Sequence, residues 1–237
     1  MIDNRLMTIA DMVSRKGIFL DVGTDHGYLP IYLIKNGKID KAIASDVSKG
    51  SLSKAIEEVK KEKLQYKIET RLGSGLMVIK EDDKLDTVVL AGMGGILISE
   101  LIAEKLEYIK KADIEFIVQP VQSPESVRKF FQKEKFTIIE EKLAKAEGRI
   151  YHIIKARYDD NYEMINYESE TDYEIGKAII ESNDASQKAL LLELLDYKLN
   201  EQLKIKAQLE TLNRESVKSR YEEVICKIER LENLINR

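Results

Sequence analysis

The sequence predicts an α/β protein, with a doubly wound and mostly parallel sheet followed by a C-terminal α-helical antiparallel coiled coil. In residues 1–158, short apolar runs without clean polar alternation are separated by helical stretches, which is typical of parallel strands buried on both faces. From Lys177 onward the chain has no glycine or proline and carries an apolar repeat. We therefore expect a sheet domain over 1–158, an acidic connector over 159–183 and a two-helix coiled coil over 184–237.

The sheet domain is expected to begin with an amphipathic helix and then to alternate strands with helices. The predicted strands cover residues 18–22, 42–46, 67–72, 87–91 and 116–119. The predicted helices cover residues 4–15, 28–35, 51–62, 96–104 and 125–132. Two further β-like runs, 136–146 and 149–158, meet at the sequence "EGR" and predict an antiparallel hairpin that closes one edge of the sheet.

The coiled coil is predicted from apolar residues that alternate four and three positions apart, the spacing of a heptad seam. They are Val217, Tyr221, Val224, Ile228, Leu231 and Ile235, with a matching start at Leu192, Leu195 and Leu199. The stretch "NRES" around Asn213 predicts a break and a new helix start. The charges of both helices fit a solvated face better than a binding surface.

The composition limits the class of protein. The chain has 237 residues, of which 43% are hydrophobic, enough for one sizeable domain with an appendage. No apolar run approaches the roughly 20 residues that cross a bilayer, and the N-terminus lacks a basic-then-apolar signal, so we expect a cytoplasmic protein with no membrane partner. Because Cys226 is the only cysteine, we expect neither an intrachain disulfide nor a bound metal.

The charge is unevenly distributed along the chain, although the net value is −4. Residues 1–158 carry 27 Lys and Arg against 24 Asp and Glu, whereas 159–183 carry one against eight. The front domain is therefore mildly basic, which permits RNA binding without predicting it. For an RNA partner we expect help in docking from cations of the coiled coil, namely Lys198, Lys204, Lys206, Lys218, Arg220 and Lys227.

A glycine turn follows the first predicted strand in the sequence "DVGTDHGYLP". Asp21, Gly23 and Gly27 form D-x-G-x-x-x-G, whereas a dinucleotide-binding G-x-G-x-x-G loop would need glycine where this chain has Asp25. A diphosphate disfavours a neighbouring carboxylate, but S-adenosylmethionine has no phosphate and carries positive charge on sulfur and amine. Asp25 therefore favours the sulfonium ligand, with helix capping as its structural alternative.

Two further strand ends carry residues that suit an adenosine-bearing ligand. Asp46 ends the second predicted strand, 23 residues after Gly23, where a carboxylate can accept hydrogen bonds from both ribose hydroxyls. "GSGL", which begins with Gly73 and Ser74, ends the third strand, where backbone would pass under the adenine. The structural alternatives are a strand-end cap for Asp46 and a plain turn for "GSGL".

The sequence "AGMGG" at the end of the fourth strand either brings backbone close to a flat ligand or makes a sharp turn. The chain lacks the Asn/Asp-Pro-Pro-aromatic element usual for methylation of exocyclic amines, and Cys226 lies too far along the chain to attack a pyrimidine carbon. The remaining methyl acceptor is an in-plane ring nitrogen. Adenine N1 has a free lone pair at neutral pH, so alignment and charge stabilisation would suffice.

These motifs, together with "QP" at Gln119 and Pro120 and the coiled coil, make the chain resemble the bacterial tRNA (adenine22-N1)-methyltransferase family over nearly its whole length. The resemblance implies a Rossmann-like class I methyltransferase, S-adenosylmethionine as donor and a D-arm adenine of tRNA as acceptor. We also expect a monomer or weak dimer.

The resemblance also implies roles for individual residues. The expected cofactor-binding residues are Asp21, Gly23, His26, Gly27, Asp46, Val47, Gly73, Ser74, Gly92 and Met93. Those expected to serve the target base are Asp25, Tyr28 and Gly94. Ser74 departs from the acidic or amide residue that class I enzymes often place against the adenine amine.

Two other functions remain as alternatives. The first is a nicotinamide-dependent oxidoreductase, which would need the missing loop glycine and usually a Tyr-x-x-x-Lys proton donor. The second is a non-catalytic interaction protein that acts through its coiled coil. Arg5, Arg128 and Arg149 are interpreted as surface arginines within possible reach of phosphates, and His152 as a packed strand residue.

Overall fold

The computed structural model describes residues 2–212 and 214–237. The chain divides into two compact units, Met1–Asn166 and Tyr167–Arg237. The division falls inside the acidic segment for which the sequence predicted a separate connector over 159–183. The second half of that segment forms short helices that belong to the C-terminal unit.

The first unit is built on one seven-stranded sheet with the order β3-β2-β1-β4-β5-β7-β6. Its strands are β1 Ile18–Val22, β2 Lys41–Asp46, β3 Ile68–Leu72, β4 Leu85–Gly94, β5 Glu115–Gln122, β6 Phe136–Ala146 and β7 Arg149–Tyr158. The first five strands are mutually parallel, and β7 pairs antiparallel with both β5 and β6. This confirms the predicted doubly wound, mostly parallel sheet closed by a hairpin.

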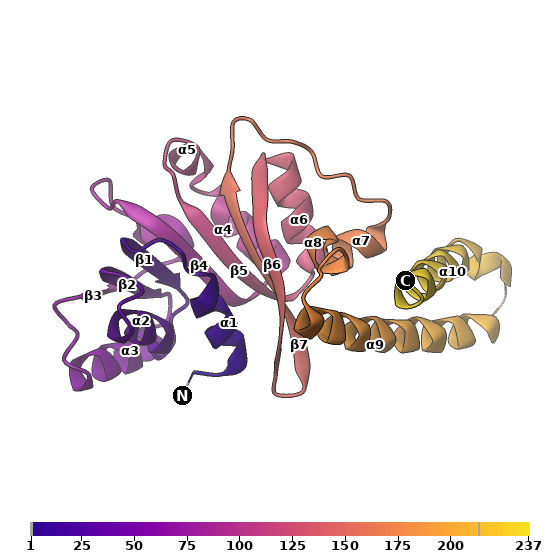
Figure 1. Ribbon diagram of the computed structural model, residues 1–237, viewed down its shortest axis with the longest axis horizontal. Helices are drawn as coiled ribbons and strands as arrows, with labels where there is room; N and C mark the ends of the chain where they lie inside the picture. The colour runs from indigo at the N-terminus through magenta and orange to yellow at the C-terminus, as the bar shows by residue number, and fades with distance from the viewer. Residues whose placement is uncertain (1, 213) are drawn as a thin grey trace. The chain divides into compact units, whose positions relative to one another are not determined.

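Helices cover both faces of this sheet (Figure 1). They are α1 Asn4–Met12, α2 Tyr28–Lys35, α3 Lys49–Lys61, the short 3-10 helix η1 Gly75–Val78, α4 Gly95–Ala103, α5 Leu106–Ile109 and α6 Pro124–Lys133. One core cluster holds the apolar residues of α4, α5, α6 and η1, and a second holds those of α1, α2 and α3. Strands buried from both sides explain why their sequences lack a polar alternation.

Several details of the first unit differ from the sequence predictions. The first helix ends at Met12 rather than near residue 15, because Val13 already has extended backbone. The short elements η1 and α5 were not predicted. Arg128 is not a surface arginine: its side chain is fully buried and its Nε donates to Glu141 at 2.7 Å, because α6 packs this face against β6.

The C-terminal unit contains α7 Glu170–Ile175, α8 Lys177–Ile180, α9 Ala185–Glu210 and α10 Arg214–Ile235. The two long helices run antiparallel, and the Tyr221 hydroxyl of α10 donates to Glu210 of α9 at 3.0 Å. Two predicted seam positions are wrong. Leu192 is 46% exposed while Leu191, Leu194 and Leu195 are buried, and Leu234 rather than Ile235 is buried. The predicted break at Asn213 lies outside the described residues.

Acidic residues of α7 hold the two long helices together. Glu174 accepts from Lys198 of α9 at 2.9 Å and from Lys227 of α10 at 2.8 Å. Although burial raises the pKa of Glu174, these two lysines bring it below its usual value. Asp172 likewise pairs with Arg230 of α10 at 2.8 Å. The acidic residues after the unit boundary are therefore part of this unit's structure rather than a spacer.

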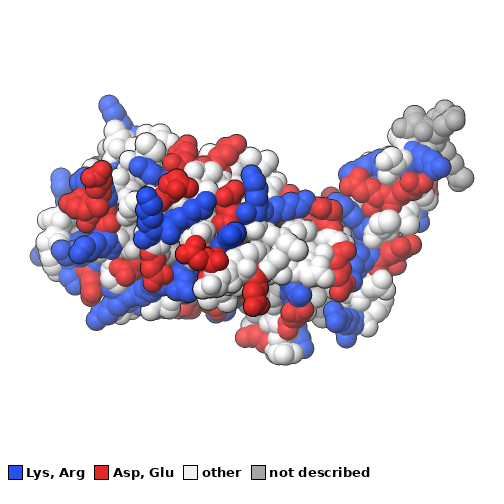
Figure 2. Space-filling view, turned by 90° about the horizontal axis from the view of Figure 1, so that it is seen from above, with Lys and Arg blue, Asp and Glu red and all other residues white. Residues whose placement is uncertain are grey.

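Most of the cations expected to dock RNA already have partners inside this unit. Lys204 pairs with Glu201, Lys206 with Glu210 and Arg220 with Glu223, in addition to the two lysines on Glu174. Figure 2 shows cations and acids interspersed over the face that it presents. No described helix is long and apolar enough to cross a membrane, and no cluster of three or more candidate metal ligands occurs within residues 2–212 and 214–237.

Candidate active site

The strand order reverses between β1 and β4, which places a crevice at the carboxyl ends of these neighbouring strands. A pocket of about 390 Å³ lies there. It is lined by Asp3, Arg5, Leu6, Asp21, Gly23, Thr24, Asp25, His26, Tyr28, Leu29, Ala91 and Gly92. Six of the residues expected from sequence to serve the site thus meet in one pocket: Asp21, Gly23, Asp25, His26, Tyr28 and Gly92.

The turn after β1 is fixed by hydrogen bonds to the neighbouring strand. The N–H groups of Gly23 and Thr24 both donate to the Ser45 carbonyl of β2 at 2.9 Å. Gly23 adopts a left-handed backbone with φ of 76°. A glycine is favoured here because other residues rarely adopt this conformation, and a Cβ would also meet Met93 Cε at 2.6 Å.

Asp21 is a buried carboxylate at the base of the pocket. Burial raises the pKa of Asp21 to about 6, opposed by the hydroxyl of Thr24, which donates to Oδ2 at 2.6 Å. Asp46 raises this pKa further, whereas the guanidinium of Arg5 lowers it. Because burial makes its charge costly, a cationic ligand group near Asp21 would be strongly favoured.

Asp25 does not cap the helix that follows it. The N-cap of α2 is Gly27, which has φ of 68°, and no side chain accepts a capping hydrogen bond there. Asp25 itself has a left-handed backbone with φ of 46°, and its carboxylate lies 3.5 Å from His26 Nε2 and 3.7 Å from Lys54 Nζ. The capping alternative for Asp25 is thus wrong, and its carboxylate lies at the pocket with 58% of the side chain exposed.

Asp46 connects the ends of β1 and β2. Its Oδ1 accepts the Ser48 N–H at 2.8 Å, and its Oδ2 accepts the Asp25 N–H at 3.3 Å. Val47, which follows, is 72% exposed at the same end of the sheet. A carboxylate with an exposed apolar neighbour fits a ribose and the base attached to it.

The aromatic rings of His26 and Tyr28 lie parallel beside this turn. Their centroids are 5.0 Å apart with an interplanar angle of 4°. Both rings border the pocket, so they offer a flat surface to a planar ligand. Gly27 lies between them in the chain but donates its N–H to Thr24 and does not line the pocket.

The first glycines of the sequence "AGMGG" belong to the end of β4 instead of turning at once. Met93 and Gly94 still pair with Pro120 and Gln122 of β5 through an irregular register. Gly92 has φ of 77° and open space where a Cβ would lie. Gly94 is the N-cap of α4 and does not line the pocket, whereas Gly92 and the preceding Ala91 do.

Gly73 and Ser74 lie at the end of β3, outside this pocket. Gly73 donates its N–H to the Asp46 carbonyl at 3.0 Å, and a Cβ on it would meet Val78 Cγ1 at 2.6 Å. Ser74 is the N-cap of η1 without a side-chain capping bond. Both residues follow β3, which pairs with β2, the strand that ends at Asp46. If Asp46 binds a ribose, the backbone of Gly73 and Ser74 could border the attached base.

A polar contact that the sequence does not reveal lies at the wall formed by α1. Arg5 lines the pocket, and its Nη1 donates to Gln119 Oε1 at 2.7 Å. The same oxygen accepts the Gly92 N–H at 3.1 Å. Gln119 is fully buried on β5, 114 positions from Arg5 in the chain, so no local sequence signal could connect them.

The charges of this site suit S-adenosylmethionine better than a dinucleotide. Asp3, Asp21 and Asp25 line the pocket together with Arg5, and Asp46 bonds the backbone of Asp25 beside it. This excess of carboxylates would repel a diphosphate but favour a ligand whose reactive end carries a sulfonium and an ammonium group. The residues present therefore fit this cofactor.

The sequence of this chain is similar to those of known proteins. The family model described as tRNA (adenine(22)-N(1))-methyltransferase matches residues 19–233 of the chain. The enzyme of that description from Bacillus subtilis is 31% identical over 159 residues, which cover 67% of this chain and 66% of that relative. The aligned part is thus about two thirds of each protein.

Solved structures match over nearly the whole chain. The crystal structure of a putative tRNA (m1A22) methyltransferase from Streptococcus pneumoniae has a TM-score of 0.87 at 27% identity, covering 99% of this chain and 100% of that one. That protein in complex with S-adenosyl-L-methionine gives a TM-score of 0.80 at 28% identity, with the same coverage. With the family model matching most of its length, the chain belongs to the tRNA (adenine(22)-N(1))-methyltransferase family.

Proposed function

We propose that this protein transfers the methyl group of S-adenosylmethionine to N1 of an adenine in tRNA. The observation that carries the proposal is the pocket at the carboxyl ends of β1 and β4, in which Asp21, Asp25, Tyr28 and Gly92 meet. Membership of the family supplies the reaction, and the acidic lining supports a cationic cofactor.

Asp46 and the turn after β1 would hold the nucleoside part of the cofactor. The Asp46 carboxylate accepts two backbone N–H groups and lies at the end of β2, where it could also accept ribose hydroxyls. Val47 would pack against the base, with Gly73 and Ser74 next to it. Gly23, Met93 and Gly92 would border the sulfur, and Asp21 would face its positive end.

The acceptor adenine would lie against Tyr28, with the glycine stretch from Gly92 to Gly94 at its edge, and His26 would border the cofactor. When bound, the cofactor supplies an electrophilic methyl group. Asp25 would accept a hydrogen bond from the adenine amine, align the ring and stabilise the positive charge that the ring gains. No side chain needs to remove a proton, because adenine N1 carries none at neutral pH.

We also propose which adenine of the tRNA is methylated. The family description gives adenine 22 as the acceptor, and we expect this adenine to lie in the D-arm. We expect the protein to act as a monomer or weak dimer in the cytoplasm. A nicotinamide-dependent oxidoreductase is not favoured, since Asp25 stands where a dinucleotide loop needs glycine. A non-catalytic interaction protein is not favoured, since carboxylates suited to the cofactor line the pocket.

The proposal can be tested with two unmodified tRNA transcripts that differ only by adenine or guanine at position 22. Incubation with methyl-labelled S-adenosylmethionine should label the first transcript and leave the second at background. Equal labelling of both would contradict the assigned position, and labelling of neither would contradict the reaction. Calorimetry with S-adenosylhomocysteine and with NAD distinguishes this proposal from the oxidoreductase alternative. The proposal predicts binding of S-adenosylhomocysteine, whereas the alternative predicts binding of NAD alone.

A further inference from the structure

Two glycines, Gly94 and Gly95, bring the end of β5 against the start of α4. Gly94 pairs with Gln122 of β5, and a Cβ on Gly94 would meet Gln122 Nε2 at 3.3 Å. At Gly95 a Cβ would meet the Ser123 carbonyl oxygen at 2.1 Å, which no real side chain tolerates. Gly95 therefore lets the turn after β5 approach the helix, and Gly94 leaves room for the amide of Gln122.

The backbone that carries Gln122 is fixed on both sides. Strand pairing with Gly94 holds it on the side of β4. Ser123, the next residue, has a left-handed backbone with φ of 53°, and α6 begins directly after it at Pro124. Such a backbone at a residue other than glycine costs free energy and recurs at functional sites. The turn thus places Gln122 at a definite point beside the glycine stretch.

The amide of Gln122 is available to a ligand. The residue is exposed, and its side chain forms no hydrogen bond within residues 2–212 and 214–237. It also lies outside the lining of the pocket assigned to the cofactor. Because β4 lies between β1 and β5, Asp25 and Gln122 follow the strands on either side of the glycine stretch. An acceptor base at the edge of this stretch would have Asp25 on one side and Gln122 on the other.

Methylation at N1 limits how an adenine can be recognised. N1 must keep its lone pair free for the methyl group, which leaves N6 and N7 to be read. The N6 amine has two hydrogens, and Asp25 can accept the one on the N1 side. The N7 side then presents one donor and one acceptor next to each other. A glutamine amide matches this pair with its oxygen and its NH₂ group.

We propose that Gln122 recognises the acceptor adenine along its N6–N7 edge, with Oε1 accepting from the N6 amine and Nε2 donating to N7. Guanine offers two acceptors on the same edge, of which one amide can satisfy only one. Gln122 is therefore a residue that determines specificity for the base. This inference rests on the proposed function and adds to it the group that selects adenine.

The test uses tRNA transcripts with adenosine or 7-deazaadenosine at position 22, which differ in the N7 acceptor. Gln122→Ala should lower kcat/KM on the adenosine transcript by about 10- to 100-fold, because two hydrogen bonds are lost. The preference for adenosine over 7-deazaadenosine, taken as the ratio of the two kcat/KM values, should be about 3- to 10-fold greater in the unchanged protein than in Gln122→Ala. Removing N7 also alters the basicity of N1, but it does so equally for every variant.

Two controls complete the experiment. Gln65→Ala changes an exposed glutamine in the turn before β3 and should keep both the rate and the preference of the unchanged protein. Calorimetry should give the same affinity for S-adenosylhomocysteine in Gln122→Ala, since Gln122 lies outside the cofactor pocket. Gln122→Glu keeps an acceptor for N6 but loses the donor to N7, so it should lose the preference for adenosine.

A merely structural role of Gln122 would lower kcat/KM for both transcripts and leave the preference as it is in the unchanged protein. That result, or an unaltered kcat/KM in Gln122→Ala, overturns this inference and leaves the proposed function standing. If the unchanged protein methylates neither transcript, the proposed function is contradicted and this inference falls with it.

Discussion

The backbone N–H of Asp25 donates to the Asp46 carboxylate at 3.3 Å, so the end of β2 holds the turn that follows β1. The same carboxylate accepts the N–H of Ser48, the N-cap residue of α3, at 2.8 Å. The residue expected to bind the cofactor ribose therefore also fixes the backbone of the residue expected to serve the target base.

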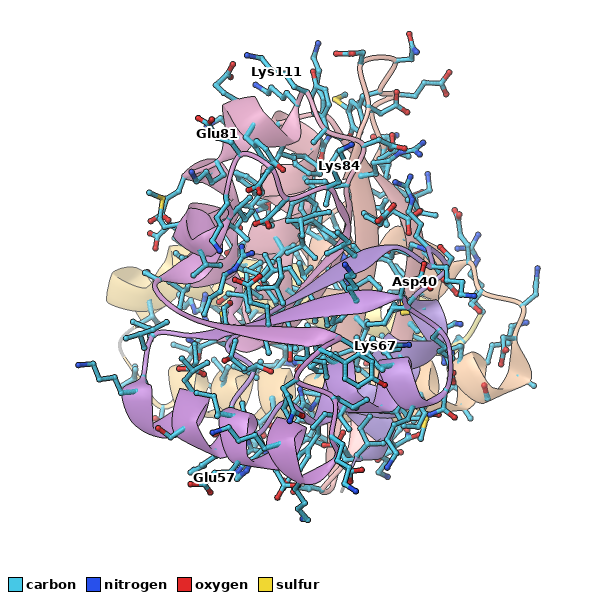
Figure 3. All side chains as sticks on the ribbon, turned by 90° about the vertical axis from the view of Figure 1, so that its left-hand side faces the viewer. Asp40, Glu57, Lys67, Glu81, Lys84 and Lys111 are labelled. Carbon is cyan, nitrogen blue, oxygen red and sulfur yellow. The ribbon has the colours of Figure 1, made fainter. Side chains whose placement is uncertain are left out.

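Replacing Asp46 with alanine should weaken binding of S-adenosylhomocysteine by about 10- to 100-fold, because the ribose loses a charged acceptor and the turn loses its anchor. Calorimetry measures this, with Glu57→Ala as the control. Glu57 lies on the exposed side of α3, away from the sheet (Figure 3), and its loss should have no effect. Unaltered affinity in Asp46→Ala would reject a ribose-binding role.

Asp25→Asn should lower kcat by about 100-fold while changing cofactor affinity little, since it keeps the shape of the side chain but removes its charge. Turnover at saturating tRNA and calorimetry measure the two effects. Asp25→Gly is a useful companion, because glycine accepts the left-handed backbone with φ of 46°. It should fold well and still lose turnover. Near-wild-type kcat in either variant would exclude a catalytic carboxylate.

The buried carboxylate of Asp21 should make folding pH-dependent. Burial raises the pKa of Asp21 to about 6, above its value in the unfolded chain, so its ionisation lowers stability as pH rises through this range. Asp21→Asn should thus unfold at higher urea concentration than the unchanged protein. The free energy of unfolding of Asp21→Asn should exceed that of the unchanged protein by about 1 kcal/mol more at pH 8 than at pH 5. If Asp21→Asn exceeds the unchanged protein in free energy of unfolding by the same amount at both pH values, burial does not raise the pKa of Asp21.

Removal of the C-terminal unit should separate cofactor binding from tRNA binding. A chain ending at Asn166 keeps the whole sheet, whereas one ending at residue 183 would leave Glu174 without Lys198 and Lys227. The chain 1–166 should bind S-adenosylhomocysteine normally but show a raised KM for tRNA with a weaker salt dependence. Unchanged kinetics with tRNA would limit the C-terminal unit to a structural or partner-binding role.

Much of the first unit could be predicted because its signals are local. The boundaries of α2, β6 and β7 coincide with those expected from apolar runs and turn residues. The end of β4 was placed too early, at residue 91, because three glycines suggest a turn. In the structure Met93 and Gly94 remain paired with β5, and a strand pairing of this kind depends on the partner strand.

The site was only partly visible in the sequence. Residues next to strand ends, such as Asp21 and Asp46, could be recognised from their position. Arg5 and Gln119 could not, since their contact depends on how α1 packs on the sheet. In the C-terminal unit the heptad spacing correctly indicated two helices, but Leu191 and Leu194 of α9 are buried whereas Leu192 is exposed.

The central claim is methylation of adenine N1 at position 22 of tRNA, and mapping the product tests it most directly. An unmodified transcript would be incubated with the enzyme and S-adenosylmethionine, cut with a ribonuclease and analysed by mass spectrometry, with nucleoside chromatography to distinguish 1-methyladenosine from its N6 isomer. We predict one added methyl group in the fragment containing residue 22, recovered as 1-methyladenosine. A methyl group in another fragment, or recovery as N6-methyladenosine, would contradict the claim.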